Sequence, residues 1–269
     1  MALCAVDDAA ADPVLPALNS YGQPPFVGPE RNDGLAKAFV DLFNQTTGGR
    51  PTLRLDNLPR KRLELTLVDR AFAGVALFLA PEFLSPAARH RGTWSQPVMV
   101  DENLIVSVRD LKLSSLDDLD GLKLGGISGH VYKWLGPAIE NGRVRREDAP
   151  DHISNLKKLC LGRVDFVIIS RSELAGTQPQ VSCAEPFRRV AFPEPQVIVR
   201  RVLVRMPDED ETKEALEAVA SLACGPRWSQ LLAQYGLSTV GCRSSATSLG
   251  ERAKPCKGRA APRISGQPG

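Results

Sequence analysis

A helix, a glycine and an apolar strand follow one another in this chain, and the order constrains its fold more than any other feature. An amphipathic segment begins at Asn155 and stops at Gly162, and the apolar strand 164–169 follows. A similar plan occurs earlier, with a helical segment over 60–67 and an apolar strand over 74–79. Parallel α/β sheets are built from such units. We therefore expect an α/β protein of two similar lobes, with a cleft between them that suits a small molecule.

The composition favours a folded chain and argues against nucleic acid as a partner. The 269 residues are 43% hydrophobic, enough for one large domain or two modest ones. The net charge is +3, but the stretch 238–269 holds most of the excess, with Glu251 as its single acid. Its basic residues are Arg243, Arg252, Lys254, Lys257, Arg259 and Arg263. The rest of the chain is slightly acidic, so we expect no nucleic-acid partner for the folded part and a disordered basic tail over 238–269.

The start of the chain has two interpretations: an export signal clipped from a start further upstream, or a chance match. The run Ala9-Ala10-Ala11 before Asp12-Pro13 resembles a signal-peptidase site. It lacks a basic segment before it, and its apolar stretch is short. Residues 1–13 are therefore read as the remnant of an export signal or as a disordered start. No apolar run approaches the roughly 18 residues of a membrane span.

The six cysteines are widely spaced and form no CxxC pair, so we predict no zinc site, no other metal and no cofactor. Cys160 and Cys224 fall on predicted helices, where small buried apolar residues are expected. Cys242 and Cys256 lie in the tail, and whether they pair in an oxidising compartment is left open.

Periodicity and breakers predict the remaining elements. Strands are expected over 14–18, 52–55, 103–108, 122–127 and 197–205, helices over 34–47, 131–140, 154–161, 210–224 and 228–235, a helical turn over 116–121, and a loop over 82–93.

Six short motifs occur in one order along residues 14–237. They are Tyr21-Gly-Gln-Pro-Pro-Phe26, Gly34-Leu35, Trp94-Ser95-Gln96-Pro97, Leu116-Asp-Asp-Leu-Asp-Gly121, Leu159-Cys-Leu-Gly-Arg-Val-Asp165, and the helix 228–237 with its Tyr-Gly end. In this order they resemble the extracellular solute-binding proteins of family 3, the type II periplasmic-binding fold that serves polar amino acid transporters.

The resemblance implies a two-lobed α/β fold in which each lobe is a mainly parallel sheet flanked by helices, with two hinge crossings. Lobe 1 would comprise 14–104 and 203–237, and lobe 2 would comprise 105–202. The crossings would fall near 103–106 and 201–204. The implied protein is a periplasmic monomer whose partners are a small polar solute and the membrane permease of an ABC transporter.

Ligands of open α/β sheets lie beyond the carboxyl ends of the strands. On the first such loop, Tyr21 and Phe26 could stack on a ligand or anchor the loop. After the second strand, Arg60 and Arg62 stand at the start of a helix, where the helix dipole disfavours a cation. Their presence there indicates either an anionic partner or simple exposure to solvent.

The resemblance also implies a bidentate arginine for a ligand carboxylate, placed before the Trp94 motif. Arg89 and Arg91 are both off register, so the anchor is Arg91, Arg89 or absent. Trp94 belongs to the same expected group, and a solvated loop is the alternative.

The turn after the strand 122–127 carries three further candidates. Ser128 could bind an anion at a helix start, His130 could be a pH-sensitive donor or a helix cap, and Tyr132 follows them. Ser170 stands where the resemblance implies an aspartate for a ligand ammonium, and a hydroxyl cannot supply that charge.

No catalytic signature is present, and catalytic residues are predicted to be absent. Glu82 is the single carboxylate placed in a cleft loop. The prediction is therefore a non-enzymatic solute-binding protein of an importer. The alternatives are an orphan ligand-sensing domain of the same fold and a dehydratase-like enzyme on it.

Overall fold

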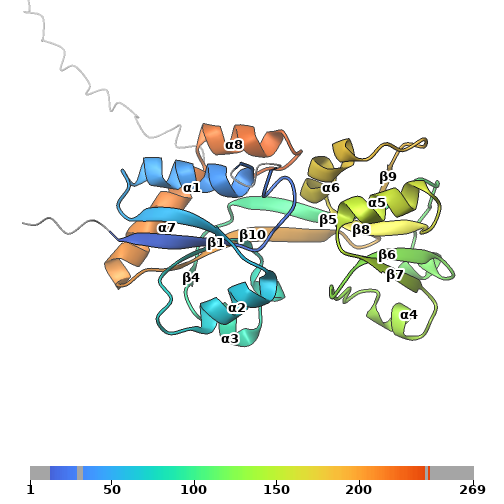
Figure 1. Cartoon of the computed structure of the whole chain (residues 1–269), viewed down its shortest axis with the longest axis horizontal. Helices are drawn as coiled ribbons and strands as arrows, with labels where there is room; N and C mark the ends of the chain where they lie inside the picture. The colour runs from blue at the N-terminus through green and yellow to red at the C-terminus, as the bar shows by residue number, and fades with distance from the viewer. Residues whose placement is uncertain (1–12, 29–32, 240–241, 243–269) are drawn as a thin grey trace, which may run out of the picture.

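In the computed structural model, which describes residues 13–28, 33–239 and 242, two α/β lobes are joined by two long strands (Figure 1). The joining strands are β5 (Met99–Ser107) and β10 (Gln196–Arg205), and they pair antiparallel with each other. The strand order is β2-β1-β3-β10-β5-β8-β6-β7. Thus β10 extends the sheet of one lobe while β5 extends the sheet of the other.

We call lobe 1 the part that carries both ends of the described chain. Its strands are β1 (Val14–Asn19), β2 (Thr52–Asn57), β3 (Gly74–Leu79) and β4 (Thr93–Trp94). Its helices are α1 (Leu35–Thr46), α2 (Arg60–Val68), η1 (Pro81–Phe83), α3 (Pro86–Arg89), α7 (Glu209–Ala223) and α8 (Pro226–Ala233). Apolar clusters on the two faces of its sheet centre on Phe78 and Trp228 on one side and on Leu63 and Leu67 on the other.

Lobe 2 repeats this plan on a smaller scale. Its strands are β6 (Lys123–Ile127), β7 (Arg145–Ala149), β8 (Phe166–Ser170) and β9 (Arg188–Val190). Its helices are η2 (Leu116–Leu119), α4 (Gly136–Glu140), α5 (His152–Cys160), α6 (Arg171–Thr177) and η3 (Gln178–Gln180). Two apolar clusters again cover the two sheet faces.

The two helix–strand units predicted from the sequence are present as α2–β3 and α5–β8. Each strand is parallel to a neighbour, β3 to β1 and β8 to β6, and all residues of both strands are buried. Gly162 follows α5 with a φ of +65°, a left-handed conformation that suits glycine at a helix end. The mixed α/β, two-lobed fold class is therefore as predicted.

Several local predictions are wrong. The helix expected over 131–140 begins only at Gly136, because Pro137 lacks an N–H and is tolerated in the first turn of a helix but not within it. The expected loop over 82–93 contains η1 and α3. The segment β7 was missed because its sequence, Arg-Arg-Glu-Asp-Ala, has no apolar alternation.

The predicted lobe boundaries fall inside the joining strands. The division between 104 and 105 lies in β5, and that between 202 and 203 lies in β10. Because both strands belong to both lobes, the boundaries of lobe 1 (14–104, 203–237) and lobe 2 (105–202) stay predictions. The expected start 1–13 and tail 238–269 lie almost wholly outside the described residues. Within the described part, no helix is long and apolar enough to cross a membrane.

Two disulfides correct the cysteine predictions. Cys160 pairs with Cys183 and Cys224 pairs with Cys242, at Cα separations of 5.3 and 5.4 Å. Cys160 and Cys224 are thus not free apolar residues: each lies at a helix end, where its partner comes close from a following loop. The pairing of Cys242 with Cys256, which the sequence left open, is not formed, because Cys242 is bonded to Cys224. Cys256 itself lies outside the described residues.

Reduction of the disulfides is expected to destabilise the protein by about 3 kcal/mol for each bond, because each closes a loop of moderate length. Urea unfolding with and without dithiothreitol measures the change in free energy. The double variant Cys224→Ala/Cys242→Ala should lose the free energy of unfolding that one disulfide contributes, about 3 kcal/mol. Alkylation of all six cysteines in the unfolded, unreduced protein would contradict both bonds.

Candidate functional site

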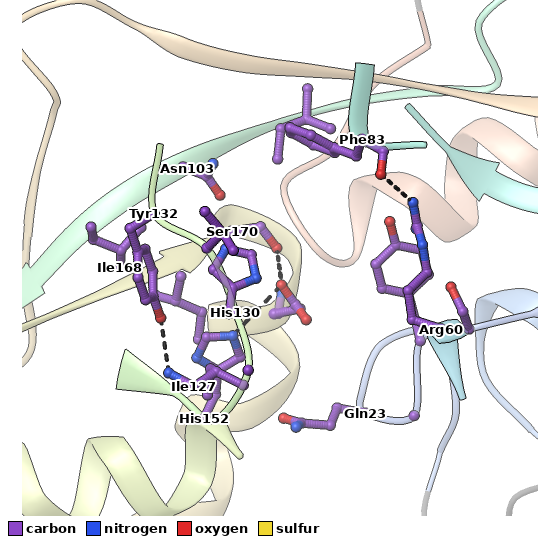
Figure 2. A pocket seen from close by; sticks show the side chains of 18 of the residues that line it. Gln23, Arg60, Phe83, Asn103, Ile127, His130, Tyr132, His152, Ile168 and Ser170 are labelled. Atoms are coloured by element: carbon purple, nitrogen blue, oxygen red, sulfur yellow. Dashed lines mark hydrogen bonds and ion pairs between the residues drawn. The ribbon is translucent and has the colours of Figure 1, made fainter. Parts of the chain in front are cut away.

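A cavity of about 600 Å³ lies between the lobes, with the joining strands as its floor (Figure 2). Asn103 on β5 and Ile198 and Arg200 on β10 line the floor. Gln196, Ile198 and Arg200 share one face of β10, because side chains two apart on a strand point the same way. Asn103 on β5 lies opposite Gln196 and therefore points to that same face. Lobe 1 contributes the loop 20–23, and lobe 2 contributes the turn 129–134. The volume is typical of small-molecule sites.

Glu173 supplies an acidic group on the lobe 2 wall. Ser170 caps α6 by accepting from the Glu173 backbone N–H at 3.3 Å, and its hydroxyl donates to Glu173 Oε2 at 2.7 Å. The His152 Nε2 atom lies 3.9 Å from the same carboxylate oxygen. The Glu173 side chain is 19% exposed, so part of it still meets solvent in the cavity.

His130 and Tyr132 form the adjoining part of the wall (Figure 2). Their rings meet edge to face at 4.6 Å, and the Tyr132 hydroxyl accepts from the Ile127 N–H at 3.0 Å. Burial raises the pKa of Tyr132, so the phenol stays protonated. Desolvation lowers the pKa of His130 below 6.5; Glu173 opposes this, while His152 and Arg146 add to it. His130 is therefore mostly neutral at neutral pH.

The lowered pKa of His130 has a definite consequence for stability. Below pH 6.5 the unfolded chain binds a proton that the folded protein resists, so stability should fall as the pH drops from 6.5 toward the folded pKa. Above pH 6.5 the contribution is constant. Urea midpoints of the wild type and His130→Gln between about pH 5 and about pH 8 measure it. The difference should shrink at acid pH. The control is His90→Gln, because His90 lies outside the cavity lining; parallel profiles for His130→Gln and the wild type would contradict the expectation.

The lobe 1 wall carries a cation of its own. Arg60 begins α2, and its Nε donates to Glu64 at 3.0 Å while one Nη donates to the Phe83 carbonyl at 2.7 Å. The Arg60 side chain is 34% exposed, and Arg60, Glu64 and Phe83 all line the cavity. The guanidinium is thus oriented by two neighbours and still reaches solvent.

The Arg200 guanidinium on the floor is buried and fully engaged. It pairs with Asp101 at 3.0 Å, donates to the Tyr21 hydroxyl at 2.5 Å, and lies over the Tyr21 and Phe26 rings at 4.7 and 5.0 Å. Burial by itself would lower the pKa of Arg200, but Tyr21, Asp101 and Glu173 raise it, so the guanidinium stays charged.

The structure brings five of the ten sequence-predicted site residues to this cavity and places five elsewhere. At the cavity are Tyr21, Arg60, His130, Tyr132 and Ser170. Outside its lining are Phe26, Arg62, Arg91, Trp94 and Ser128.

The five outside residues have local roles or face solvent. Phe26 is buried behind Tyr21, with ring centroids 4.4 Å apart. Arg62 and Arg91 are exposed. Trp94 donates to the Arg89 carbonyl at 3.1 Å, and Ser128 donates to the Ala149 carbonyl at 3.2 Å.

Sequence reasoning missed Glu173, His152, Asn103 and Arg200. Glu82 does not line the cavity, whereas Glu64 and Glu173 do. A signal for Glu173 was available: it follows the apolar strand by three residues, as the first acid after Ser170. Arg200 gave no signal, because its partners lie far away in the sequence.

The lining can bind a solute with separated charges and an apolar part. One wall offers a carboxylate, the other a guanidinium, and aromatic rings lie on both. Among the described residues, no group of three or more His, Cys, Asp or Glu side chains could hold a metal ion.

Comparison with known proteins identifies the fold. No family model and no curated protein sequence matches the chain. Among solved structures, the arginine-specific periplasmic binding protein STM4351 of Salmonella typhimurium has a TM-score of 0.58 at 13% identity, covering 83% of this chain and 99% of its own. An ancestral arginine-binding protein has a TM-score of 0.60 at 15% identity, with 82% and 97% covered.

A histidine kinase sensor domain similar to periplasmic binding proteins has a TM-score of 0.62 at 14% identity, and the match covers 85% of this chain and 98% of that domain. Likeness at this level of identity establishes the fold. The chain therefore has the two-lobed fold of the amino-acid-binding periplasmic binding proteins, as the order of its motifs predicts.

Proposed function

We propose that this protein captures a small polar, amino-acid-like solute between its lobes and delivers it to the membrane permease of an ABC importer. The observation that carries the proposal is the interlobe cavity with Glu173 on one wall and Arg60 on the other. A zwitterion has charges of both signs, and partly buried charge pairs of this kind are strong where water is scarce.

Glu173 changes the expected ligand class. Ser170 lacks the charge to hold a ligand ammonium, but its hydroxyl orients the Glu173 carboxylate three residues on. On the opposite wall, Arg60 takes the place of the carboxylate anchor expected from Arg89 or Arg91. Arg89 donates to the Leu84 carbonyl at 3.3 Å, and neither Arg89 nor Arg91 lines the cavity. An ordinary amino acid or a basic amino acid therefore fits this proposal.

Export and the absence of catalysis belong to the same proposal. Two disulfides favour an oxidising compartment such as the periplasm. The structural neighbours described above are binding and sensor proteins, which favours a non-enzyme. We propose a monomer that closes its lobes on the ligand by a hinge motion.

A ligand-sensing domain is the second candidate, favoured by the similarity to the kinase sensor domain. Both roles require ligand binding, so they separate only in the cell. Loss of solute uptake on deletion of the gene supports the importer. Retained uptake with a lost transcriptional response to the same solute supports the sensor.

The test of binding is a thermal-shift screen of the full chain against amino acids, opines, polyamines and organic acids. A ligand at about a hundred times its Kd adds about 2.7 kcal/mol to stability. A stabilising amino acid whose effect is lost in Arg60→Ala supports the proposed site. A hit that Arg60→Ala and Glu173→Ala leave unchanged would place the ligand elsewhere, and no hit in the panel would contradict an amino-acid-like ligand.

A further inference from the structure

A chain of buried polar contacts crosses the floor of the cavity from one lobe to the other. It starts at the Tyr21 hydroxyl on the first loop of lobe 1, which accepts from Arg200 on β10. Arg200 pairs with Asp101 on β5. Asp101 Oδ2 accepts from the Ser172 hydroxyl at 2.6 Å, and its Oδ1 accepts from the Ser172 N–H at 3.2 Å. Ser172 lies on α6 of lobe 2.

The same contacts continue to the acid on the lobe 2 wall. Each serine hydroxyl has one proton: that of Ser172 goes to Asp101 and that of Ser170 goes to Glu173. The two hydroxyl oxygens are 3.1 Å apart without a hydrogen bond between them, and the first turn of α6 links the two serines. The Arg200 side chain is 3% exposed and that of Asp101 is fully buried. Buried polar groups that are all paired hold one geometry, because any other arrangement leaves a charge unpaired.

The backbone around Arg200 is shaped to receive it. Phe78 on β3 has a φ of +57°, a left-handed conformation that is unusual for a non-glycine residue, and its carbonyl accepts from Arg200 at 3.4 Å. The β3–β10 pairing shifts register between Arg201 and Leu203, next to this contact.

The two lobes also touch directly beside this chain of contacts. Gly176 on α6 packs so closely against the first loop that a Cβ there would lie 2.6 Å from the Pro24 carbonyl carbon. The loop that carries Tyr21 and the helix that carries Glu173 are therefore in direct contact at Pro24 and Gly176.

We propose that Arg200 and Asp101 are positioning residues at the pivot between the lobes, and that they hold the Tyr21 ring and the Glu173 carboxylate in a fixed relation on the cavity floor. Closure then moves the outer rims of the lobes, which carry Phe83 on one side and Val131 and Trp134 on the other. Phe83, Val131 and Trp134 are exposed apolar side chains, at 39%, 71% and 38%, and closure would bring them together.

The test measures the distance between the lobes in the ligand-free protein, so it stands whether or not an amino acid binds. Bio-orthogonal spin labels replace Lys61 on α2 and Glu140 on α4, two exposed residues on helices that project from different lobes (Figure 1). Arg200→Lys and Asp101→Asn should broaden and shift the distance distribution. Gly176→Ala should shift it without broadening, because the added methyl group wedges the loop from α6.

Two controls separate positioning from general stability. Arg201→Lys changes the next residue, whose Nη1 donates to the Ser95 carbonyl within lobe 1 at 2.7 Å, and it should leave the distribution unchanged. Val219→Ala destabilises the core of lobe 1 without removing a contact of the polar chain and should also leave the distribution unchanged. If Arg200→Lys does not fold, Tyr21→Phe and Ser172→Ala each remove one contact of the chain and should broaden the distribution to a lesser degree. A wild-type distribution in folded Arg200→Lys and Asp101→Asn, or in Tyr21→Phe and Ser172→Ala, would overturn the proposal.

Discussion

Replacement of Arg200 by methionine is expected to cost about 3–5 kcal/mol of folding free energy, the range for breaking one side of a buried ion pair. The cost arises from Asp101, whose fully buried side chain would lose the cation that offsets its desolvation. The donors that remain, from Ser172 and the Glu102 N–H, are neutral. Urea unfolding of the full chain measures the loss.

Two variants test the cause of that loss. Arg200→Met/Asp101→Leu removes both charges and should recover a large part of it, because an apolar pair of similar size carries no desolvation cost. Arg201→Met removes one hydrogen bond to a carbonyl and should cost only about 1 kcal/mol. A loss in Arg200→Met no larger than that in Arg201→Met would show that the pair contributes little.

The elements that were predictable from the sequence are those whose causes are local. The strand 74–79 has the predicted bounds because it is a continuous apolar run beginning at a glycine. The helix 60–67 ends one residue later than predicted. Helix α4 shows the limit of periodicity, because apolar spacing over 131–140 suggested ten helical residues and one proline decided where the helix begins.

The candidate site was predictable only where the side chain stands at the end of a recognisable strand. Tyr21, Arg60, His130, Tyr132 and Ser170 follow strands, and all five line the cavity. Strand ends do not reveal which way a side chain turns: Ser128 follows β6 as His130 does, yet its hydroxyl bonds the Ala149 carbonyl. Orientation depends on partners that the spacing of residues does not contain.

Arg200 shows why the rest could not be predicted. Arg200 and Arg201 are adjacent cations in a strand, a pattern usual for a solvated edge. Their environments differ because β10 leaves one lobe for the other at this point. Asp101, Tyr21 and Phe26 enclose Arg200, and Asp101 is 99 residues away in the sequence. From the sequence alone, Arg200 is therefore interpreted as a surface residue, because the sequence does not show where β10 passes between the lobes.

Glu173→Gln is expected to weaken binding of an amino acid found in the screen by roughly 10- to 150-fold, corresponding to about 1.5–3 kcal/mol for a hydrogen bond to a charged group. The substitution keeps the size of the side chain and the bond from Ser170 but removes the negative charge that would face a ligand ammonium. Isothermal titration of the full chain measures the change in Kd. Glu82→Gln, an exposed acid outside the cavity lining, is the matched control and should leave Kd unchanged.

The charge itself can be isolated with a second ligand. The analogue of the same amino acid in which the ammonium is acetylated has no cation for Glu173 to hold, so wild type should bind it weakly. Glu173→Gln should bind that analogue at least as well as wild type does, because a neutral amide can pair with the acetylated nitrogen and no buried carboxylate stays uncompensated. Equal losses for both ligands in Glu173→Gln would mean that the carboxylate shapes the wall through His152 and Ser170 rather than binding the ammonium. The acidic pole of the site would then lie with Glu64, the other carboxylate in the described lining.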